Sequence, residues 1–463
     1  MRNIARQVLL AHVSLVGTGC VHVVSPYVTT GDRTQLLAAQ PIVRFGKADS
    51  LRLPTIDVDE QTTYQEIVGF GAALTDASAW VIQHRLSDAR RDSLMKELFE
   101  RVGLSFIRID MGASDFALWQ YSYDDMPPGE RDPAVVHFSI DPDRAETLPI
   151  LKRALALNPR LAIVASPWSA PAWMKTTGSM IKGTLRDDAY QSYALYFSRF
   201  LAAYEAEGVP IFAITVQNEP HFEPGDYPGM RLDPAQRARF VRQYLGPLNS
   251  ARILEWDHNW DQPNAPLAVL ADSGARRYVS GVAWHCYAGD VSAQTIVHDA
   301  YPDKDAYITE CSGGDWAPKF ADNLAWMVSK LIIGGTRNWA RGVILWNLAL
   351  DEQHGPHTGG CGNCRGVVTI KSDGTVERNE EYYALAHVSR FVPPGARRIA
   401  STSGLDGLES VAFSHVNADF IVLTLIVLNT NATTKEFAVR NHGRAFRYSL
   451  PAGAVATFQW RGP

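Results

Sequence analysis

PIFAITVQNE, residues 210–219, shows the pattern that decides the fold: an apolar, β-branched run that ends in polar residues. A continuous apolar run of this length is typical of a strand buried on both faces, as in a parallel sheet. Asn218 and Glu219 stand where the run ends. An unpaired carboxylate there would cost several kcal/mol. We therefore expect Glu219 to be paired, hydrogen-bonded or neutral, and to have a function.

The same pattern recurs along the chain, each time followed by a longer segment with helical spacing. Strands alternating with helices indicate an α/β fold, and eight such units over residues 66–385 predict a (β/α)8 TIM barrel. The eight runs are EIVGFGAAL (66–74), LSFIRIDMG (104–112), RLAIVASPW (160–168), PIFAITVQNE (210–219), PLAVLADS (266–273), VSGVAWHCY (279–287), DAYITECSG (305–313) and GVILWNLAL (342–350).

Two of the intervening helices can be predicted in detail. Between Asp188 and Gly208, aromatic and leucine side chains recur at helical period and predict a helix that packs on the sheet. Ser87 is a predicted N-cap for a second helix, which ends before Gly103.

The pattern changes after about residue 386, where short strand-like segments are separated by turn residues. Residues 386–463 are therefore predicted to form an attached β-sandwich domain, and the extended segment 40–65 is expected to add strands to it.

Composition narrows the possible functions. The chain has 463 residues, with 44 basic and 49 acidic side chains and a net charge of −5, so it lacks the basic excess of a nucleic-acid-binding protein.

Residues 1–22 resemble a secretory signal, with Arg2 and Arg6 before a short apolar stretch, and Cys20 could carry a lipid tether. We expect a secreted, periplasmic or cell-surface protein with no membrane span.

Two glutamates are the strongest catalytic candidates. Glu219 and Glu310 both end apolar runs, and a barrel of this type presents its functional residues at the carboxyl ends of its strands. Hydrolysis of a glycosidic bond needs two facing carboxyl groups, one as proton donor and one as nucleophile or base. Trp168 and Trp346, also at strand ends, could stack on sugar rings. A glycan-binding protein without turnover is the alternative from another class.

Several motifs, in order, resemble glycoside hydrolase family 30, the glucosylceramidase family. They are GFGAALTDASA (69–79), ASPWSAPAWMKT (165–176), TVQNEP (215–220), ITEC (308–311) and LWNLALDEQHGP (345–356). The resemblance implies a barrel with an attached sandwich and retaining hydrolysis of β-glycosides, with Glu219 as acid/base and Glu310 as nucleophile. The mechanism that the resemblance implies requires no cofactor and no metal.

The resemblance also implies a sugar-binding set, made of Asp76, Trp168, Asn218, His285, Tyr287 and Trp346. We expect Tyr287 to hydrogen-bond Glu310. A charged Glu310 is expected to raise the pKa of Glu219 and keep it protonated. Retention requires the two carboxyl groups to lie about 5–5.5 Å apart.

The substrate prediction is a β-glucoside, by analogy with glucosylceramidases. Two departures alter the rim: Cys286 stands where those enzymes typically carry Trp, and His357 where they typically carry Asn. HFEPGDYPGM (221–230) is reminiscent of members that cut β-1,6-glucan. An endo-β-1,6-glucanase is therefore the alternative within the family.

The cysteines leave three possibilities open near residue 360. Cys361 and Cys364 could form a disulfide, remain free thiols, or join His354 and His357 in a zinc site. Cys311 follows Glu310 and could be considered a thiol nucleophile, but the carboxylate pair explains the cleft better.

Overall fold

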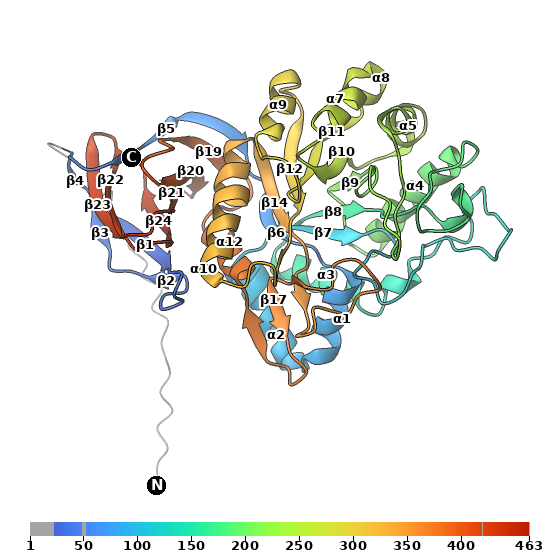
Figure 1. The fold of residues 1–463 in the computed structure, drawn as a ribbon, viewed down its shortest axis with the longest axis horizontal. Helices are drawn as coiled ribbons and strands as arrows, with labels where there is room; N and C mark the ends of the chain where they lie inside the picture. Colours follow the sequence, from blue (N-terminus) through green and yellow to red (C-terminus); the bar gives the residue numbers. More distant parts are fainter. Residues whose placement is uncertain (1–22, 49–51, 419, 463) are drawn as a thin grey trace, which may run out of the picture.

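Eight parallel strands close into a barrel in the middle of the chain. The computed structural model describes residues 23–48, 52–418 and 420–462. An isolated parallel bridge between Ala73 and Arg108 joins the first and last strands of the sheet, so the predicted TIM barrel is confirmed (Figure 1). In sheet order, the strands are β6 (Gly69–Ala72), β14 (Ala340–Leu345), β12 (Asp305–Glu310), β11 (Val279–His285), β10 (Arg252–Asn259), β9 (Ala213–Thr215), β8 (Ala162–Ser166) and β7 (Phe106–Asp110).

Helices surround the barrel, and both helices predicted in detail are present. α4 carries the predicted aromatic stripe on its buried side, and Ser87 caps α2 by accepting a hydrogen bond from the backbone of Arg90. The longer helices are α1 (Asp76–Arg85), α2 (Asp88–Lys96), α3 (Thr147–Leu157), α4 (Tyr190–Ala206), α5 (Pro234–Phe240), α7 (Asn264–Ala271), α9 (Ala293–Ala300), α10 (Phe320–Met327) and α12 (Glu380–Ser389).

The predicted fifth strand is wrong. Residues 266–273 lie mostly in helix α7, and the fifth strand is β10, which precedes it. β10 does not read as an apolar run because it buries two carboxylates, Glu255 and Asp257, each paired with a buried arginine. The shift matters for function, since β10 contributes side chains to the site described below.

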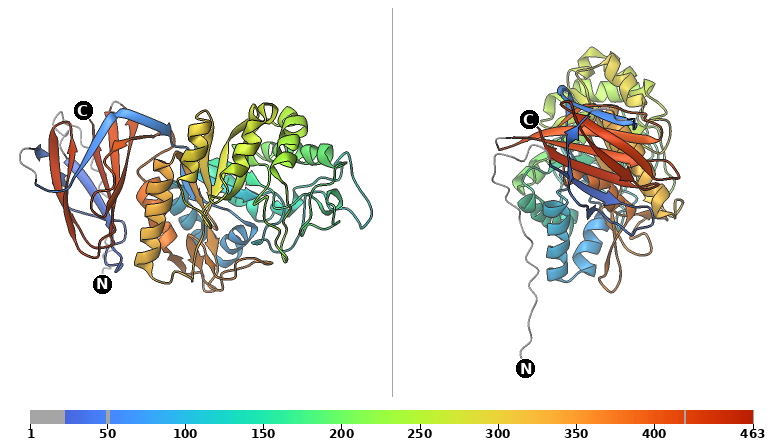
Figure 2. Two further views of the ribbon diagram at one scale, coloured as in Figure 1. Left: turned by 45° about the horizontal axis from the view of Figure 1, so that its top comes forward. Right: turned by 90° about the vertical axis from the view of Figure 1, so that its left-hand side faces the viewer.

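The β-sandwich packs beside the barrel, with α12 between them (Figures 1 and 2). His387 of α12 hydrogen-bonds Thr29 and Thr457 of the sandwich, each at 2.8 Å. The sandwich begins earlier than the predicted segment 40–65, because β1 (Val23–Thr29) and β2 (Ala38–Ala39) also belong to it. The other strands are β3 (Val43–Arg44), β4 (Gly46–Lys47), β5 (Thr55–Glu66), β19 (Arg397–Ser401), β20 (Leu408–Asn417), β21 (Phe420–Asn429), β22 (Lys435–Asn441), β23 (Arg444–Leu450) and β24 (Val455–Arg461).

The predicted signal segment, residues 1–22 with Cys20, lies outside the described residues. No helix in the part of the chain that the structure describes is both long and apolar enough to cross a membrane.

Candidate active site

The two glutamates open into one cavity at the carboxyl ends of the barrel strands. Glu219 follows β9, and Glu310 is the last residue of β12. The cavity has a volume of about 490 Å³, and carboxylates and aromatic rings dominate its walls. It is lined by Asp115, Glu219, Phe222, Pro224, Gly225, Asp226, Tyr227, Tyr287, Glu310, Trp316, Trp346, Gly360, Cys361 and Cys364.

Arg108, on β7, organises the floor of the site. Its fully buried guanidinium donates to Oε2 of Glu310, to Oδ1 of Asn218 at 2.7 Å and to Oδ2 of Asp257 at 2.7 Å. Because Arg108 engages the amide oxygen of Asn218, the amide nitrogen is the group left to donate to a sugar hydroxyl. One arginine thus positions the carboxylate of Glu310 and the amide beside Glu219.

Glu310 has a second donor, as predicted. The hydroxyl of Tyr287 donates to Oε1 of Glu310 at 3.0 Å, and the Tyr287 ring remains 46% exposed at the cavity wall. Trp346 lines the same cavity. Trp168, predicted to contact sugar, is not among the residues that line the cavity; it is as buried as Trp346 and stacks on it with 5.1 Å between ring centroids. Trp168 therefore supports the wall that Trp346 forms.

Two histidines hold Glu219 from neighbouring strands. Nδ1 of His285 lies 3.1 Å from Oε1 of Glu219, and Nδ1 of His258 lies 3.3 Å from the same oxygen. Glu219 itself has a positive φ of 44°, a strained conformation for a residue with a side chain. His285, predicted to line the sugar site, is fully buried, and its two ring nitrogens contact Glu219 and Asp257.

His285 also bounds the separation of the two carboxyl groups. Its Nδ1 atom lies 3.1 Å from Oε1 of Glu219 and 3.7 Å from Oε1 of Glu310. The two oxygens are therefore at most about 7 Å apart, a range that includes the roughly 5–5.5 Å of retaining enzymes and excludes most of the roughly 6.5–9.5 Å of inverting ones.

The charge distribution at Glu219 differs from the expectation. Burial raises the pKa of a carboxyl, but at Glu219 the adjacent His258 and His285 outweigh burial and lower its pKa below the usual range. Burial lowers the pKa of His285, but Glu310, Asp257 and Glu219 outweigh it and raise that pKa to about 9. The expected net rise in the pKa of Glu219 is therefore wrong, because the two histidines outweigh burial.

Comparison with known proteins supplies the family. The model described as the Glycosyl hydrolase family 30 TIM-barrel domain matches residues 67–392, and that of the family's beta sandwich domain matches residues 395–458. The chain belongs to glycoside hydrolase family 30. It is a glycoside hydrolase of a retaining family, built as a TIM barrel with a C-terminal β-sandwich.

Named relatives of this family 30 chain include two kinds of enzyme. It is 36% identical to the endo-1,6-beta-D-glucanase BGN16.3 of Trichoderma harzianum, over 87% of this chain and 86% of the relative. It is 30% identical to putative glucosylceramidase 4 of Caenorhabditis elegans, over 81% and 76%. Among solved structures, the endo-beta1,6-glucanase BT3312 superposes with a TM-score of 0.86 at 34% identity, covering 95% of this chain and 99% of that one.

Asp76 has a different environment from the other predicted site residues. It begins α1, accepts a hydrogen bond from Tyr121 at 2.9 Å and lies near Asp143. Burial first, and then Asp143, raise its pKa to about 8. The structure thus groups Asp76 with Tyr121 and Asp143, whereas Asn218, Glu219, His285 and Glu310 form the Arg108 network.

Sequence reasoning missed Arg108, Asp257 and His258. Arg108 lies inside a predicted strand, and a charge in a run that should be buried on both faces was the available signal. Asp257 and His258 belong to β10, the strand that was misplaced. Asp257 accepts from Arg108, His285 and Thr309, which together outweigh burial and lower its pKa far below the usual range.

Four cysteines of this family 30 chain, all among the described residues, form two disulfides at the site. Cys361 is bonded to Cys364, so the first of the three possibilities is confirmed, and His354 pairs with Asp315 at 2.9 Å. Cys311 is bonded to Cys286. That second disulfide removes the thiol beside Glu310 and joins the residues that follow His285 and Glu310 on adjacent strands.

A second cavity adjoins the first. It has a volume of about 430 Å³ and shares Tyr287 and Trp316 with the catalytic cavity. Trp316 and Trp326, which also line it, are 53% and 39% exposed. Exposed aromatic side chains therefore continue outward from the glutamates.

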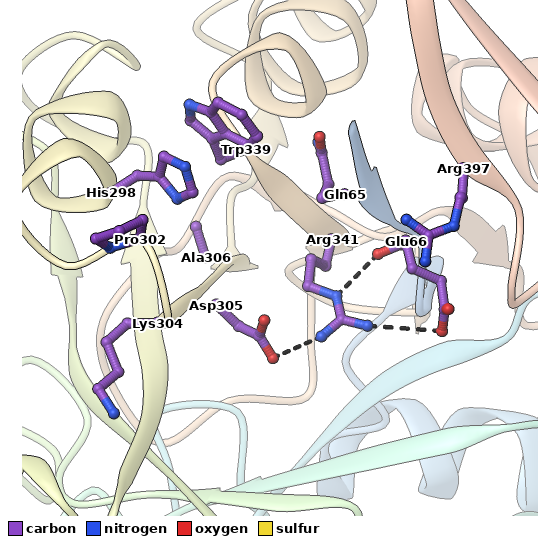
Figure 3. Close-up of a pocket in the computed structure, with 10 residues that line it drawn as sticks. All are labelled: Gln65, Glu66, His298, Pro302, Lys304, Asp305, Ala306, Trp339, Arg341 and Arg397. Atoms are coloured by element: carbon purple, nitrogen blue, oxygen red, sulfur yellow. Dashed lines mark hydrogen bonds and ion pairs between the residues drawn. The ribbon is translucent and has the colours of Figure 1, made fainter. Parts of the chain in front are cut away.

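A third cavity, of about 350 Å³, lies at the opposite end of the barrel strands (Figure 3). Figure 3 shows Arg341 between Glu66 and Asp305, donating to the Glu66 carbonyl at 2.8 Å and to the Asp305 carboxylate at 2.7 Å. Asp305 begins β12, and Arg341 is the second residue of β14. Since active sites of TIM barrels lie at the carboxyl ends of the strands, these contacts serve the junction with β5.

Proposed function

We propose that this chain is an endo-β-1,6-glucanase that hydrolyses its substrate with retention of configuration. The observation that carries the proposal is the position of the loop after β9. Phe222, Asp226 and Tyr227 of this loop line the cavity with both glutamates, and the loop lies in the segment 221–230 that is reminiscent of β-1,6-glucan-cutting members. The higher identity to endo-1,6-β-glucanases than to glucosylceramidases supports the same choice.

In the first step, Glu310 attacks the anomeric carbon and Glu219 protonates the leaving oxygen. The leaving group of a β-1,6 linkage is a primary alkoxide, which requires a proton as the C1–O6 bond breaks. Arg108 and Tyr287 hold the two oxygens of Glu310, so the nucleophile is oriented before substrate arrives. The proton that Glu219 delivers is the one it shares with His285 over 3.1 Å.

In the second step, water hydrolyses the glycosyl-enzyme ester. Glu219, now a carboxylate, removes a proton from the water, whose oxygen bonds to C1 while the bond to Glu310 breaks. Two displacements at the same carbon return the β configuration. The imidazole of His285 then receives the proton back from Glu219.

Endo action is supported by the continuity of the two cavities. The wall shared by Tyr287 and Trp316 gives a glucan chain a path beyond the catalytic cavity, with exposed indole rings for stacking. Trp316→Ala and Trp326→Ala should lower kcat/KM for long oligosaccharides more than for short ones. Trp326→Phe, which keeps an aromatic face, is the matched control.

The test is product analysis on β-1,6-glucan, glucosylceramide and xylan in parallel. A ladder of β-1,6-linked oligosaccharides is expected from the first substrate. Release of glucose and ceramide alone would instead support a glucosylceramidase. Glu310→Gln should abolish turnover while the protein still binds glucan, and an active Glu310→Gln variant would end the assignment of the nucleophile.

A further inference from the structure

Three ligand atoms, two of them on buried histidines, lie close together beside the catalytic cavity. They are Oε1 of Glu219 and the Nδ1 atoms of His258 and His285, at 3.3 Å and 3.1 Å from that oxygen. The three side chains present ligand atoms that all lie within 4.8 Å of one another. Two imidazoles and one carboxylate form a donor set that zinc enzymes also use.

His258 supplies an independent observation. Its side chain is more than nine-tenths buried, and Nδ1 lies 3.3 Å from Oε1 of Glu219 but has no hydrogen-bond partner among the described residues. Buried polar atoms normally have a partner, so a buried nitrogen without one beside a carboxylate indicates a missing partner. A cation between the two atoms would satisfy both.

His285 is oriented as metal-binding histidines are. Its Nε2 atom lies 3.1 Å from Oδ1 of Asp257, so the far nitrogen is held by a carboxylate while Nδ1 faces Glu219. A carboxylate on the far nitrogen fixes the ring and strengthens the ligand. Asp257 is in turn anchored by Arg108 and Thr309, which makes this orientation rigid.

The distances also fit an ion of the size of zinc. Tetrahedral coordination at about 2.0–2.2 Å separates the ligand atoms by roughly 3.3–3.6 Å. The two separations at Oε1 of Glu219 are close to this range, and the two imidazole nitrogens lie within 4.8 Å of each other, so the three side chains could close around the ion. Mg²⁺ and Ca²⁺ prefer oxygen ligands and octahedral or larger shells, which two imidazoles do not provide.

We infer that Glu219, His258 and His285 form a binding site for Zn²⁺ or a similar transition-metal ion, and that the bound ion inhibits the enzyme. The ion would hold the carboxylate of Glu219 as a ligand. A carboxylate bound to the ion cannot protonate the leaving oxygen. The inhibitory consequence depends on the proposed function, whereas the binding of the ion does not.

The first experiment is calorimetric titration of the purified, folded protein with ZnCl2. One ion per chain is expected, with affinity reduced at least tenfold in His258→Gln and in Asp257→Asn. His354→Ala is the matched control, because His354 lies beside the disulfide-bonded Cys364 and away from the three proposed ligands. The zinc affinity of the His354→Ala variant should equal that of the wild type. Circular dichroism identifies any variant that fails to fold.

Wild-type affinity in His258→Gln, or loss of binding in His354→Ala, would overturn the inference. If His258→Gln is unfolded, His258→Asn and His258→Ala replace it in the same comparison.

In the second experiment, Zn²⁺ should inhibit hydrolysis of β-1,6-glucan, and a chelator should restore the rate. Tight binding that leaves the rate unchanged would overturn the inhibitory part. Absence of glucan hydrolysis in every sample, with the binding pattern intact, would refute the proposed function and leave the metal site standing.

Discussion

Nη2 of Arg108 lies 2.7 Å from Oδ2 of Asp257, and neither side chain has any exposed surface. This ion pair stands beneath the catalytic glutamates, because Arg108 also holds Glu310 and Asp257 also holds His285. Charges with no access to water are tolerated only when they are paired and hydrogen-bonded. The pair therefore connects the stability of the barrel to the geometry of the site.

Replacing Asp257 with Asn should destabilise the protein strongly. The change keeps the shape of the side chain but removes the buried negative charge that Arg108 and His285 share, which leaves Glu310 and Glu219 as their remaining charged partners. Removal of one partner from a buried ion pair costs about 3–5 kcal/mol. Urea unfolding of wild type and variant measures the difference in the free energy of unfolding.

The control for this prediction is Asp272→Asn. Asp272 pairs with Arg242 at 2.8 Å at the surface, where both side chains are partly exposed. Exposed pairs contribute about 0–1 kcal/mol. Equal losses in the two variants would mean that the buried pair has no special importance.

The parts of the fold that could be predicted from sequence are those with local patterns. Glu219 closely follows the short apolar strand β9, and Glu310 ends β12, so the position of both glutamates at one end of the barrel followed from the strand pattern alone. The aromatic stripe of α4 was equally local. In each case, neighbouring residues carried the whole signal.

The parts that could not be predicted depend on contacts between distant strands. Glu255 and Asp257 make β10 look polar, and only Arg237 and Arg108, far away in the sequence, make those charges tolerable in the interior. His258 was missed with the same strand. The disulfide between Cys286 and Cys311 joins two adjacent strands whose neighbourhood the sequence does not reveal.

His285 should make stability depend on pH in the neutral to alkaline range. Its pKa is raised from 6.5 to about 9 in the folded protein, mainly by Glu310 and Asp257 against the opposing effect of burial. A raised histidine pKa stabilises the fold fully below about pH 6.5, and this contribution is lost as the pH rises through about 9. Compared with His285→Gln, the wild type should lose up to roughly 3 kcal/mol across that range. Parallel stability curves for the two proteins would contradict the prediction.

Removal of the Cys286–Cys311 disulfide should lower both stability and activity. The bond spans 25 residues, and loop closure of that length contributes roughly 3 kcal/mol to stability. It also ties the segment that carries Tyr287 to the segment that follows Glu310. We expect the double substitution to serine to lower kcat for β-1,6-glucan as well as the melting temperature.

The second disulfide offers a comparison within the same chain. Cys361 and Cys364 are three residues apart, so the loop that they close is short and its entropic contribution smaller, roughly 2 kcal/mol. Serine substitutions there should reduce stability less. A larger loss of stability at Cys361 and Cys364 than at Cys286 and Cys311 would show that loop length does not govern these two bonds.

Asp115 should act as a neutral hydrogen-bonding group in the catalytic cavity. It lines the cavity with only 7% of its surface exposed, and burial, followed by Glu310 and Glu219, raises its pKa well above the usual range. A protonated carboxyl and a carboxamide have similar shape and both donate hydrogen bonds. Asp115→Asn should therefore keep kcat/KM for β-1,6-glucan within about tenfold, or ~1.4 kcal/mol of the barrier. Asp115→Leu, which removes both polar atoms, should lose more, and Glu219→Gln should lose roughly 10²–10⁴-fold. If Asp115→Asn were as impaired as Glu219→Gln, the carboxylate of Asp115 would be charged and would take part in the reaction.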